Sequence, residues 1–445
     1  MTRNKREPAI RWLISLAIIL ATASSASASW KEKVLYSFQG GTDGATPVGG
    51  VVFDSAGNLY GATQDGGSSV CHSIYQCGTV YQLKPPAKSG DPWTETILHV
   101  FRGNAENDGA SPFGGLVIDS AGNLYGTTAY GGTGDCVLLG SKLGCGAVFE
   151  LSPPTEKGGA WTETVLYSFP TSKQGYVPWG DLVFDKQGNL YGSTIFGGGK
   201  GTTCDAFYQY CGAVFELSPP KTKGGKWTEK VLHGFAGGSD GAEPNGGLVL
   251  DSTGRIYGTT VWGGSTDCQG PGCGTVFALK PPAMTGDAWT EEIVHRFTGG
   301  DDGASPNGGP ILDAKRSLYG ATGGGGRQGA GVVFRLTAES GGRWIETVLH
   351  RFQGGTDGSD PQGLVFDSYG SLYCSSGPLV KMQRPKRNGQ RWTLDVLYEF
   401  RGAPNGRGPL DLIFGARGAL YGPTLYGGTG QLCQAGCGTV FEARP

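Results

Sequence analysis

A ten-residue motif recurs seven times along the chain and constrains the fold more than any other feature. Its clearest copy, DSAGNLYGTT, runs from Asp119 to Thr128. The motif tyrosines are Tyr60, Tyr125, Tyr191, Tyr257, Tyr319, Tyr373 and Tyr421, so by subtraction successive copies lie 65, 66, 66, 62, 54 and 48 residues apart. A period of this length, built from strand-like runs, is typical of propellers and solenoids rather than of an ordinary globular fold.

A second motif also occurs seven times, but at a different place in each repeat. Its clearest copy is WTETVLYSF from Trp161, and the seven copies begin at Trp30, Trp93, Trp161, Trp227, Trp289, Trp344 and Trp392. In the second unit, four strand-sized runs follow one another: GGLVID, NLYGTT, GAVFEL and WTETVLYSF. The D-x-x-G between the first two runs predicts a tight turn in which the aspartate accepts backbone N–H bonds. Each unit is therefore expected to form four antiparallel strands, called a to d here.

The two ends of the repeat array complement each other. The first repeat strand, residues 30–38, is a lone d strand, and the last unit ends at GTVFEARP from Gly438 without a d strand of its own. The N-terminal strand can therefore complete the last blade and leave no open sheet edge. We predict an all-β fold, a seven-bladed β-propeller of four-stranded antiparallel blades over residues 29–445.

Residues 1–28 have the layout of a secretory signal peptide. Basic residues precede an apolar run at 12–21, and Ala26-Ser27-Ala28 follows. An uncleaved anchor is the alternative, although the apolar part is about half of a ~20-residue span. We expect a monomeric protein that is secreted, periplasmic or at the cell surface, with no transmembrane segment in the mature chain. Basic and acidic residues, 36 and 38 in number, are interspersed, which argues against a nucleic-acid partner.

The eleven cysteines are expected to pair in an oxidising compartment. Spacing within the b-to-c loops suggests five disulfides: Cys71 with Cys77, Cys136 with Cys145, Cys204 with Cys211, Cys268 with Cys273, and Cys433 with Cys437. The fifth unit loses both cysteines of its loop together, as pairing predicts. Cys374 is left over, at a position where other units carry glycine. A zinc site is a weaker interpretation, because no histidine accompanies the cysteines regularly.

The combination of P-x-GGLVFD, GNLYGTT, GG and CGTVFEL resembles the Gloeo/Verruco (GloVer) tandem repeat of exported bacterial proteins, over nearly the whole mature chain. The D-x-x-GNLY core is also similar to NHL and SMP-30-like propeller repeats, in which this stretch forms the inner two strands of a blade. The resemblance implies a propeller, and it brings no established activity and no catalytic residues to this chain.

No constellation of catalytic residues is evident. Four histidines, His99, His233, His295 and His350, share one place in strand d with tyrosines of other units, which indicates a packing or rim position; only His72 lies off the pattern. The turn aspartates are best explained as turn caps. The aspartates of the d-to-a loops are somewhat better metal candidates, but an Asx-type turn explains them without a metal. They are Asp43, Asp108, Asp240, Asp302 and Asp357. The strand-d glutamates Glu95, Glu163, Glu229, Glu291 and Glu346 repeat around a ring, and no unit is found whose channel-facing residues break the repeat. We predict no catalytic residue, no metal and no cofactor.

Aromatic residues just after strand b are the candidate ligand-binding residues. AYGG, IFGG, VWGG and LYGG place Tyr130, Phe196, Trp262 and Tyr426 at equivalent positions on the face that carries the long loops. They could form a partial ring of stacking platforms for a glycan, and packing of half-buried aromatics between blades is the alternative.

The sequence therefore favours an exported, non-enzymatic binding or interaction scaffold for polysaccharide or cell-surface partners. Two other functions stay open. One is an extracellular polysaccharide lyase or hydrolase with its site at the channel mouth, and the other is a structural component of the cell envelope.

Overall fold

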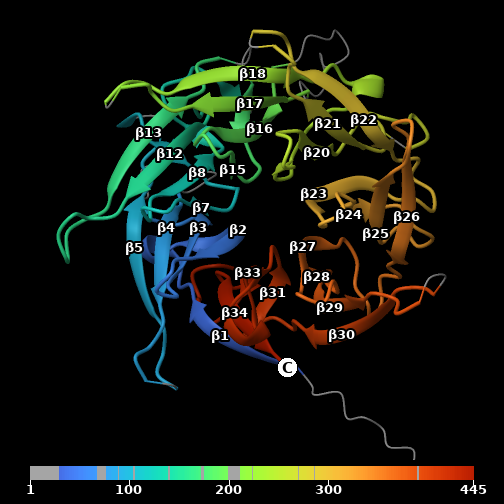
Figure 1. Cartoon of the computed structure of the whole chain (residues 1–445). Helices are drawn as coiled ribbons and strands as arrows, with labels where there is room; N and C mark the ends of the chain where they lie inside the picture. Colours follow the sequence, from blue (N-terminus) through green and yellow to red (C-terminus); the bar gives the residue numbers. More distant parts are fainter. Residues whose placement is uncertain are drawn as a thin grey trace, which may run out of the picture.

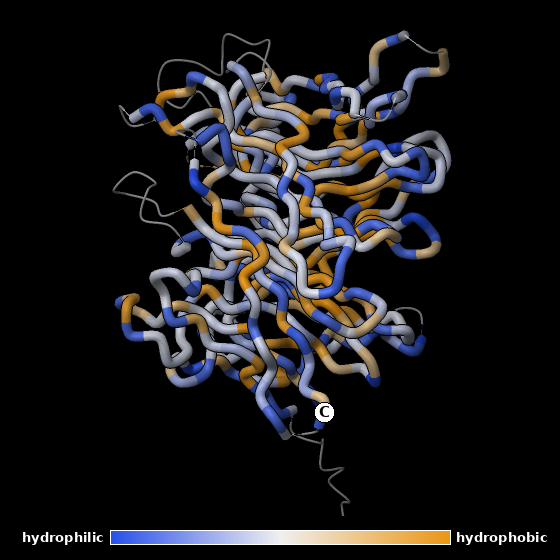
Figure 2. The backbone as a smooth tube through the Cα atoms, turned by 90° about the vertical axis from the view of Figure 1, so that its left-hand side faces the viewer, coloured by the Kyte–Doolittle hydropathy of each residue, from blue (hydrophilic) through white to orange (hydrophobic). Residues whose placement is uncertain are grey.

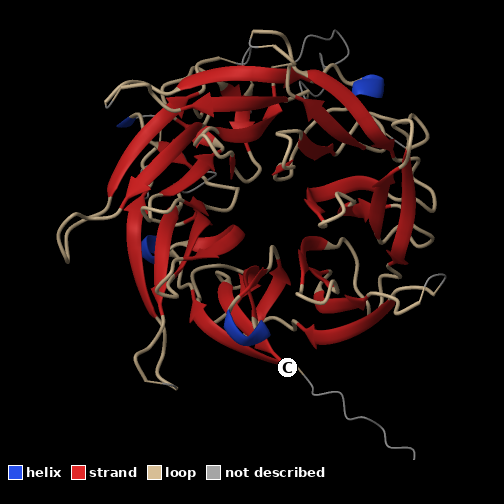
Figure 3. Ribbon diagram, in the orientation of Figure 1, coloured by secondary structure: helices blue, strands red, loops and turns tan. Residues whose placement is uncertain are grey.

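Seven β-sheets surround a central opening in the computed structural model of the chain (Figures 1 and 3). The structure describes residues 30–67, 77–88, 90–103, 106–138, 141–171, 175–198, 211–222, 224–268, 270–284, 286–387 and 390–445. Helix in these ranges is confined to short 3₁₀ turns such as η1 (Gly41–Asp43), η4 (Gly238–Asp240) and η5 (Ala416–Gly418). None of the helical segments among them is long and apolar enough to span a membrane. The predicted seven-bladed propeller is confirmed.

Each blade runs outward from strand a at the channel to strand d at the rim. Blades 1 to 3 contain β2 (Ala45–Phe53), β3 (Leu59–Asp65), β4 (Thr79–Lys84) and β5 (Thr94–Val100); β7 (Val117–Ile118), β8 (Leu124–Thr128), β12 (Ala147–Ser152) and β13 (Thr162–Ser168); and β14 (Tyr176–Pro178), β15 (Val183–Phe184), β16 (Leu190–Phe196), β17 (Ala213–Ser218) and β18 (Thr228–Gly234). Two short hairpin-like pairs accompany blade 2: β6 (Gly109–Ala110) with β9 (Tyr130–Gly131), and β10 (Val137–Leu138) with β11 (Ser141–Lys142).

The remaining blades repeat this order. They contain β19 (Val249–Leu250), β20 (Ile256–Thr260), β21 (Thr275–Lys280) and β22 (Thr290–Arg296); β23 (Ala304–Leu312), β24 (Leu318–Gly324), β25 (Val332–Ala338) and β26 (Trp344–Arg351); β27 (Gln362–Phe366), β28 (Leu372–Ser375), β29 (Pro378–Gln383) and β30 (Thr393–Glu399); and β31 (Gly406–Pro409), β32 (Ile413–Phe414), β33 (Leu420–Gly427), β34 (Thr439–Arg444) and β1 (Lys31–Ser37).

The N-terminal strand closes the ring. β1 lies antiparallel to β34, with Lys31 opposite Arg444 and Ser37 opposite Thr439. Phe38, which follows β1, is fully buried and packs edge-on against Tyr81 of blade 1, with ring centroids 5.0 Å apart. The two ends of the chain therefore share one sheet, as predicted, and no blade of the ring is left with a missing rim strand.

The turns between strands a and b explain the repeated D-x-x-G. One carboxylate oxygen of Asp119 accepts the backbone N–H groups of Ala121 and Asn123, at 2.8 and 2.9 Å. The other oxygen accepts the Tyr125 hydroxyl at 3.2 Å. Gly122 has φ +87°, which favours glycine at that place in the turn. The aspartate therefore caps the turn and also orients the motif tyrosine, whose ring is buried between blades.

Apolar side chains fill the space between neighbouring blades. Figure 2 shows apolar segments along the strands within the body and hydrophilic ones at many loop tips. The glycine of the LYG motif gives the phenylalanine of strand c its room, because a Cβ on Gly126 would lie 2.7 Å from Phe149 Cζ. In blade 6 both partners change together, since Cys374 faces Val380 across β28 and β29. Cys374 is a buried free thiol whose pKa burial raises to about 12, so it packs as a small apolar residue.

Three of the predicted disulfides are confirmed: Cys136–Cys145, Cys268–Cys273 and Cys433–Cys437. Cys77 and Cys211 are also disulfide-bonded, and the partners predicted for them, Cys71 and Cys204, lie outside the described residues.

The disulfide loops also connect the blades. The carbonyl of Cys437 accepts the N–H of Thr46 at 2.9 Å, and the carbonyl of Cys145 accepts the N–H of Val177 at 3.0 Å. In both cases the acceptor lies at the end of one blade's disulfide loop, and the donor lies at the start of the next blade's inner strand. These hydrogen bonds fix the position at which the inner strand begins.

Candidate functional site: the central channel

The innermost strands approach one another closely at the glycines of the P-x-G-G motif. A Cβ on Gly49 would lie 2.2 Å from the Gly115 nitrogen, and a Cβ on Gly180 would lie 2.4 Å from the Gly246 carbonyl oxygen. A side chain at either glycine would therefore collide with the backbone of the next blade. These glycines let the inner strands of blades 1 to 4 approach one another closely around the channel.

The residue that follows the proline of this motif supplies one side chain from each of the seven blades, and we call these seven residues the channel ring. The seven residues are Val48, Phe113, Trp179, Asn245, Asn307, Gln362 and Leu410, and all of them line one cavity of about 710 Å³. The ring is divided by chemistry. Leu410, Val48, Phe113 and Trp179 come from four consecutive blades and form an apolar arc, and Asn245, Asn307 and Gln362 come from the other three and form an amide arc.

The apolar arc contains a stacked aromatic pair. The rings of Phe113 and Trp179 lie 3.7 Å apart between centroids, with an angle of 19° between their planes. Both side chains are only partly buried, and both border the cavity. The pair presents a flat apolar surface to whatever enters the channel.

The amide arc offers hydrogen-bonding groups to the same space. Asn307 donates from Nδ2 to Asp360 Oδ1 at 3.1 Å, which fixes its orientation. The Oδ1 atom of Asn245 is buried and has no hydrogen-bond partner. A buried carbonyl oxygen without a partner costs free energy, so this atom favours a ligand or water that can donate to it.

Two carboxylates interrupt the glycine pattern at the channel. Asp181 stands where Gly115 and Gly247 stand in other units. Asp411 takes the same place in the shorter unit of blade 7, two residues before Ile413 as Gly115 is two residues before Val117. Both line the same cavity as the channel ring. The backbone N–H of Gly115 donates to Asp181 Oδ1 in a short hydrogen bond. Asp181 belongs to blade 3 and Asp411 to blade 7.

The two carboxylates influence each other's protonation. Burial raises the pKa of Asp411 to about 7, and the negative charge of Asp181 adds to the effect. Burial also raises the pKa of Asp181, while the N–H of Gly115 opposes this. Two carboxylates that titrate as a pair tend to hold one proton between them near neutral pH. The pair can donate and accept hydrogen bonds, and it is also suited to acid–base chemistry.

The aromatic residues predicted to bind a ligand do not share one environment. Tyr130 and Phe196 are 7% and 8% exposed and pack in the apolar core of blades 2 and 3, as the packing alternative expects. Trp262 is half-buried, and its Nε1 donates to Glu243 Oε2 at 2.8 Å. Tyr426 is 43% exposed and borders the channel cavity. Of the four, Tyr426 alone contributes to the wall of the channel.

The strand-d histidines lie on the rim, at the boundaries between blades, which we call seams. Each of them contacts the aspartate of its own d-to-a loop; the nitrogen–oxygen distances are 3.2 Å for His99–Asp108, 3.3 Å for His233–Asp240, 3.7 Å for His295–Asp302 and 3.0 Å for His350–Asp357. The strand-d glutamates lie on the facing blades. His72 lies outside the described residues.

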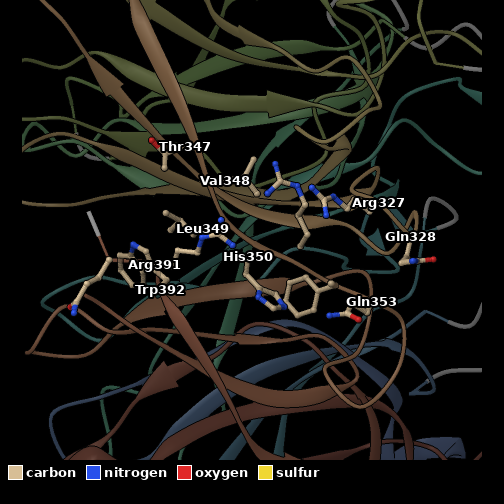
Figure 4. Close-up of a pocket in the computed structure, with 12 residues that line it drawn as sticks. Arg327, Gln328, Thr347, Val348, Leu349, His350, Gln353, Arg391 and Trp392 are labelled. Atoms are coloured by element: carbon tan, nitrogen blue, oxygen red, sulfur yellow. The ribbon is translucent and has the colours of Figure 1, made fainter. Parts of the chain in front are cut away.

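A cavity of about 750 Å³ lies at the seam between blades 5 and 6. Figure 4 shows His350 and Arg327 on one side of it, and Arg391 and Trp392 from the next blade on the other. Arg327 and Arg351 both lie near Asp301, at 3.7 and 3.8 Å, so part of their charge is already balanced. Its walls are open rim surface, and they lack the facing carboxylate present at other seams.

Sequence reasoning missed the channel ring and the two carboxylates. The expectation that no unit breaks the repeat at the channel was wrong, because Asp181 and Asp411 both do so. The signal was present in P-x-G-G, where two units read WGDL and PLDL. Neither aspartate belongs to a recurrent motif, and the glycines that they replace were interpreted only as turn residues.

Comparison with known proteins supports the architecture. The Gloeobacter/Verrucomicrobia repeat matches residues 22–204 and 199–378. The search of curated protein sequences gives no match. Among solved structures, a streptogramin B lyase is 12% identical with a TM-score of 0.52, covering 94% of this chain and 98% of its own. A catalytically inactive virginiamycin B lyase from Staphylococcus aureus with quinupristin is 13% identical with a TM-score of 0.53, covering 94% and 99%.

A putative gluconolactonase is similar over 94% of this chain and 92% of its own, with 13% identity and a TM-score of 0.38. At these identities the two lyases share the fold with this chain and define no common site. The repeat match spans well over half of the sequence, and the motifs that carry it are the turn, strand and glycine elements described above. The chain belongs to the Gloeobacter/Verrucomicrobia repeat family.

Proposed function

We propose that the protein is an exported binding scaffold that takes a carbohydrate, or the end of a polysaccharide chain, into its central channel. The observation that carries this proposal is the division of the channel ring into an apolar arc and an amide arc, in a cavity that a pair of carboxylates also lines. Sites for small ligands combine apolar walls with a few placed polar groups. A sugar ring has the matching chemistry, with C–H faces that pack on aromatic rings and hydroxyl groups that pair with amides and carboxylates.

Export is part of the proposal and rests on separate observations. Three disulfides occur in loops of the described part, and disulfides persist in oxidising compartments. The signal-peptide layout of residues 1–28 is consistent with them. A cell-surface polysaccharide is then a ligand that the protein would meet.

The test is a binding screen of neutral and acidic oligosaccharides by calorimetry, using the oxidised protein from residue 29. For a ligand that binds, Trp179→Ala is expected to weaken affinity about tenfold, because loss of ring stacking costs on the order of 1 kcal/mol. Gln362→Ala, on the opposite arc, is expected to weaken the same ligand. The matched control is Trp262→Ala, which removes a half-buried tryptophan that does not line the channel cavity.

Thermal unfolding of each variant separates lost binding from lost folding. If Trp179→Ala and Gln362→Ala are folded and bind as the wild type does, the channel is not the site. If Trp262→Ala loses binding while remaining folded, the ligand lies on the loop face instead.

A second candidate function is catalysis by the carboxylate pair. It is favoured by the shared titration of Asp181 and Asp411, since general acid–base catalysis works best with a pKa near the working pH. The two lyases of similar fold are enzymes, which shows only that such propellers can carry an active site. Assays for new reducing ends and for unsaturated products on every bound glycan decide between the two. Turnover that Asp411→Asn abolishes without loss of binding would establish the enzyme.

A further inference from the structure

Two seams at the rim carry the same three ligand-type residues in close contact. His99 of β5, Asp108 of the following loop and Glu163 of β13 place one ligand atom each within 4.8 Å of one another. His233 of β18, Asp240 and Glu291 of β22 do the same between blades 3 and 4. In both cases the histidine and aspartate belong to one unit and the glutamate to the facing blade.

The glutamates enter these clusters with an oxygen that lacks a hydrogen-bond partner. Oε1 of Glu163 and Oε1 of Glu291 are both buried and unpartnered, and so is Nε2 of His233 by hydrogen-bond geometry. An uncompensated buried carboxylate oxygen is costly, and the cost is removed either by a proton or by a cation. In each cluster the histidine Nε2 also lies near its own aspartate, 3.2 Å from Asp108 Oδ2 for His99 and 3.3 Å from Asp240 Oδ1 for His233. An ion that binds there takes the place of any proton between these two atoms and meets the unpartnered glutamate oxygen.

The other atoms of each cluster are held in place. The backbone N–H of Arg102 donates to Asp108 Oδ2 at 2.9 Å, and that of Gly109 donates to Oδ1 at 2.6 Å. The N–H of Ala236 donates to Asp240 Oδ2 at 2.6 Å. The His99 ring lies edge-on against Phe101 with centroids 4.8 Å apart, and His233 lies in the same way against Phe235. Such fixed ligands lose little freedom when an ion binds.

We propose that the seam between blades 1 and 2 and the seam between blades 3 and 4 are each a binding site for a divalent transition-metal ion such as Zn²⁺. One imidazole nitrogen and two carboxylates form a three-ligand set that suits Zn²⁺ and Co²⁺, leaving a coordination position for water. The imidazole disfavours Mg²⁺ and Ca²⁺, which take oxygen ligands. Because each site joins two blades, a bound ion links them across the rim.

The first site has an open approach. A cavity of about 410 Å³ is lined by His99, Asp108 and Glu163, and by Arg102 and Glu106 at its edge. Arg102 is paired with Glu106 at 3.0 Å, which balances its charge near the entrance. An ion can therefore reach the three ligands from solvent without movement of a blade.

Other seams of the same ring provide natural comparisons. The seam between blades 5 and 6 keeps His350 and Asp357, but Leu394 stands where the glutamate would be. The seam between blades 7 and 1 keeps Asp43 and Glu95, but Tyr36 replaces the histidine. The seam with His295, Asp302 and Glu346 has the same residue types with a wider histidine–aspartate distance of 3.7 Å.

The experiment is a calorimetric titration of Zn²⁺ into oxidised, EDTA-stripped protein from residue 29, without an affinity tag, at pH 7.5. The double variant His99→Tyr/His233→Tyr is expected to bind about two fewer ions per molecule than the wild type. Tyrosine is the residue that three other units carry at this position, so the variant should fold. The result is the difference between the numbers of ions bound by wild type and by the variant. An ion at the seam of His295, Asp302 and Glu346 would bind to both proteins and therefore does not change this difference.

Two further variants keep the result interpretable. Glu163→Gln/Glu291→Gln keeps the shape of both side chains and is expected to lose the same two ions, with loss of the Co²⁺ absorption bands that report imidazole and carboxylate ligation. His350→Tyr is the matched control and is expected to leave the number of ions unchanged. The proposal is overturned if the wild type binds no Zn²⁺, or if the folded double variants bind as many ions as it does.

Discussion

Glu95 at the seam between blades 7 and 1 should make folding less favourable as pH rises through neutrality. Its side chain is half-buried, and its Oε1 atom is buried without a hydrogen-bond partner. Burial raises its pKa from 4.5 to about 7, and the charge of Asp43 adds to this. The folded state therefore holds the proton more tightly than the unfolded state. This contribution to stability is complete below about pH 4.5, decreases as pH rises, and is gone above about pH 7.

The size of the effect follows from the same values. The interval from 4.5 to about 7 would correspond to about 3 kcal/mol for a group fully shielded from water. Solvent reaches this half-buried side chain, so we expect about 1 kcal/mol. In Glu95→Gln the amide replaces the protonated acid and no longer titrates. The free energy of unfolding of the variant, relative to wild type, should increase by about 1 kcal/mol between pH 4.5 and pH 8.

Urea unfolding followed by tryptophan fluorescence, at several pH values and in the presence of EDTA, measures this difference. Glu156→Gln is the matched control, because Glu156 is an exposed glutamate in the loop between β12 and β13. Its difference from wild type should stay constant with pH. The reasoning is refuted if Glu95→Gln also gives a constant difference, or if the variant loses stability relative to wild type as pH rises.

Two further predictions concern the closure of the ring and the a-to-b turns. Phe38→Ala should lower the free energy of unfolding by about 3 to 5 kcal/mol, as much as Phe101→Ala, because both rings are fully buried at equivalent places; a much smaller loss for Phe38→Ala in urea unfolding would mean that β1 adds little to the last blade. Asp119→Ala should cost about 1 to 3 kcal/mol by the same measurement, since it leaves the Ala121 and Asn123 N–H groups without their acceptor, and an unchanged midpoint would contradict the capping role.

The fold could be predicted from the sequence because the motifs of its strands and turns recur along the chain, up to seven times. One D-x-x-G could be any turn, but seven copies followed by LYG and preceded by a strand define a blade. The closure by β1 was predictable for a different reason. An array that begins with strand d and ends with strand c has one d strand without a blade and one blade without a d strand, and β1 fills that place. The disulfides followed from joint presence and joint loss of cysteine pairs. These inferences use the pattern of the repeat and need no knowledge of side-chain packing.

The candidate site was harder to predict because it depends on where each side chain points. Tyr130 and Tyr426 occupy the same place in the repeat, yet one is 7% and the other 43% exposed. The difference arises from the neighbouring blades, because Tyr130 is covered by the core of blades 2 and 3, where Val177 and Tyr176 also pack. The position of a residue in the repeat does not show whether side chains of a neighbouring blade bury it. The channel ring was missed for the opposite reason, since its residues vary from unit to unit, with only asparagine occurring twice, and so leave no motif.

The P-x-G-G glycines differ from blade to blade in what they permit, and this bears on function. A Cβ on Gly180 would lie 2.4 Å from the Gly246 carbonyl oxygen, and a Cβ on Gly309 would lie 2.1 Å from the Gly247 carbonyl oxygen, so neither position has room for a side chain. A Cβ on Gly247, in contrast, would meet its nearest neighbour, the Cβ of Asp181, at 3.4 Å. Some of these positions therefore admit a side chain. In blades 3 and 7 the residue that stands in place of the second glycine is an aspartate, and both aspartates line the channel cavity. Packing does not require a carboxylate there, and burial penalises it, as the raised pKa of Asp411 indicates. A side chain that the fold neither needs nor favours, placed twice in the one cavity that all seven blades share, is best explained by what the channel binds.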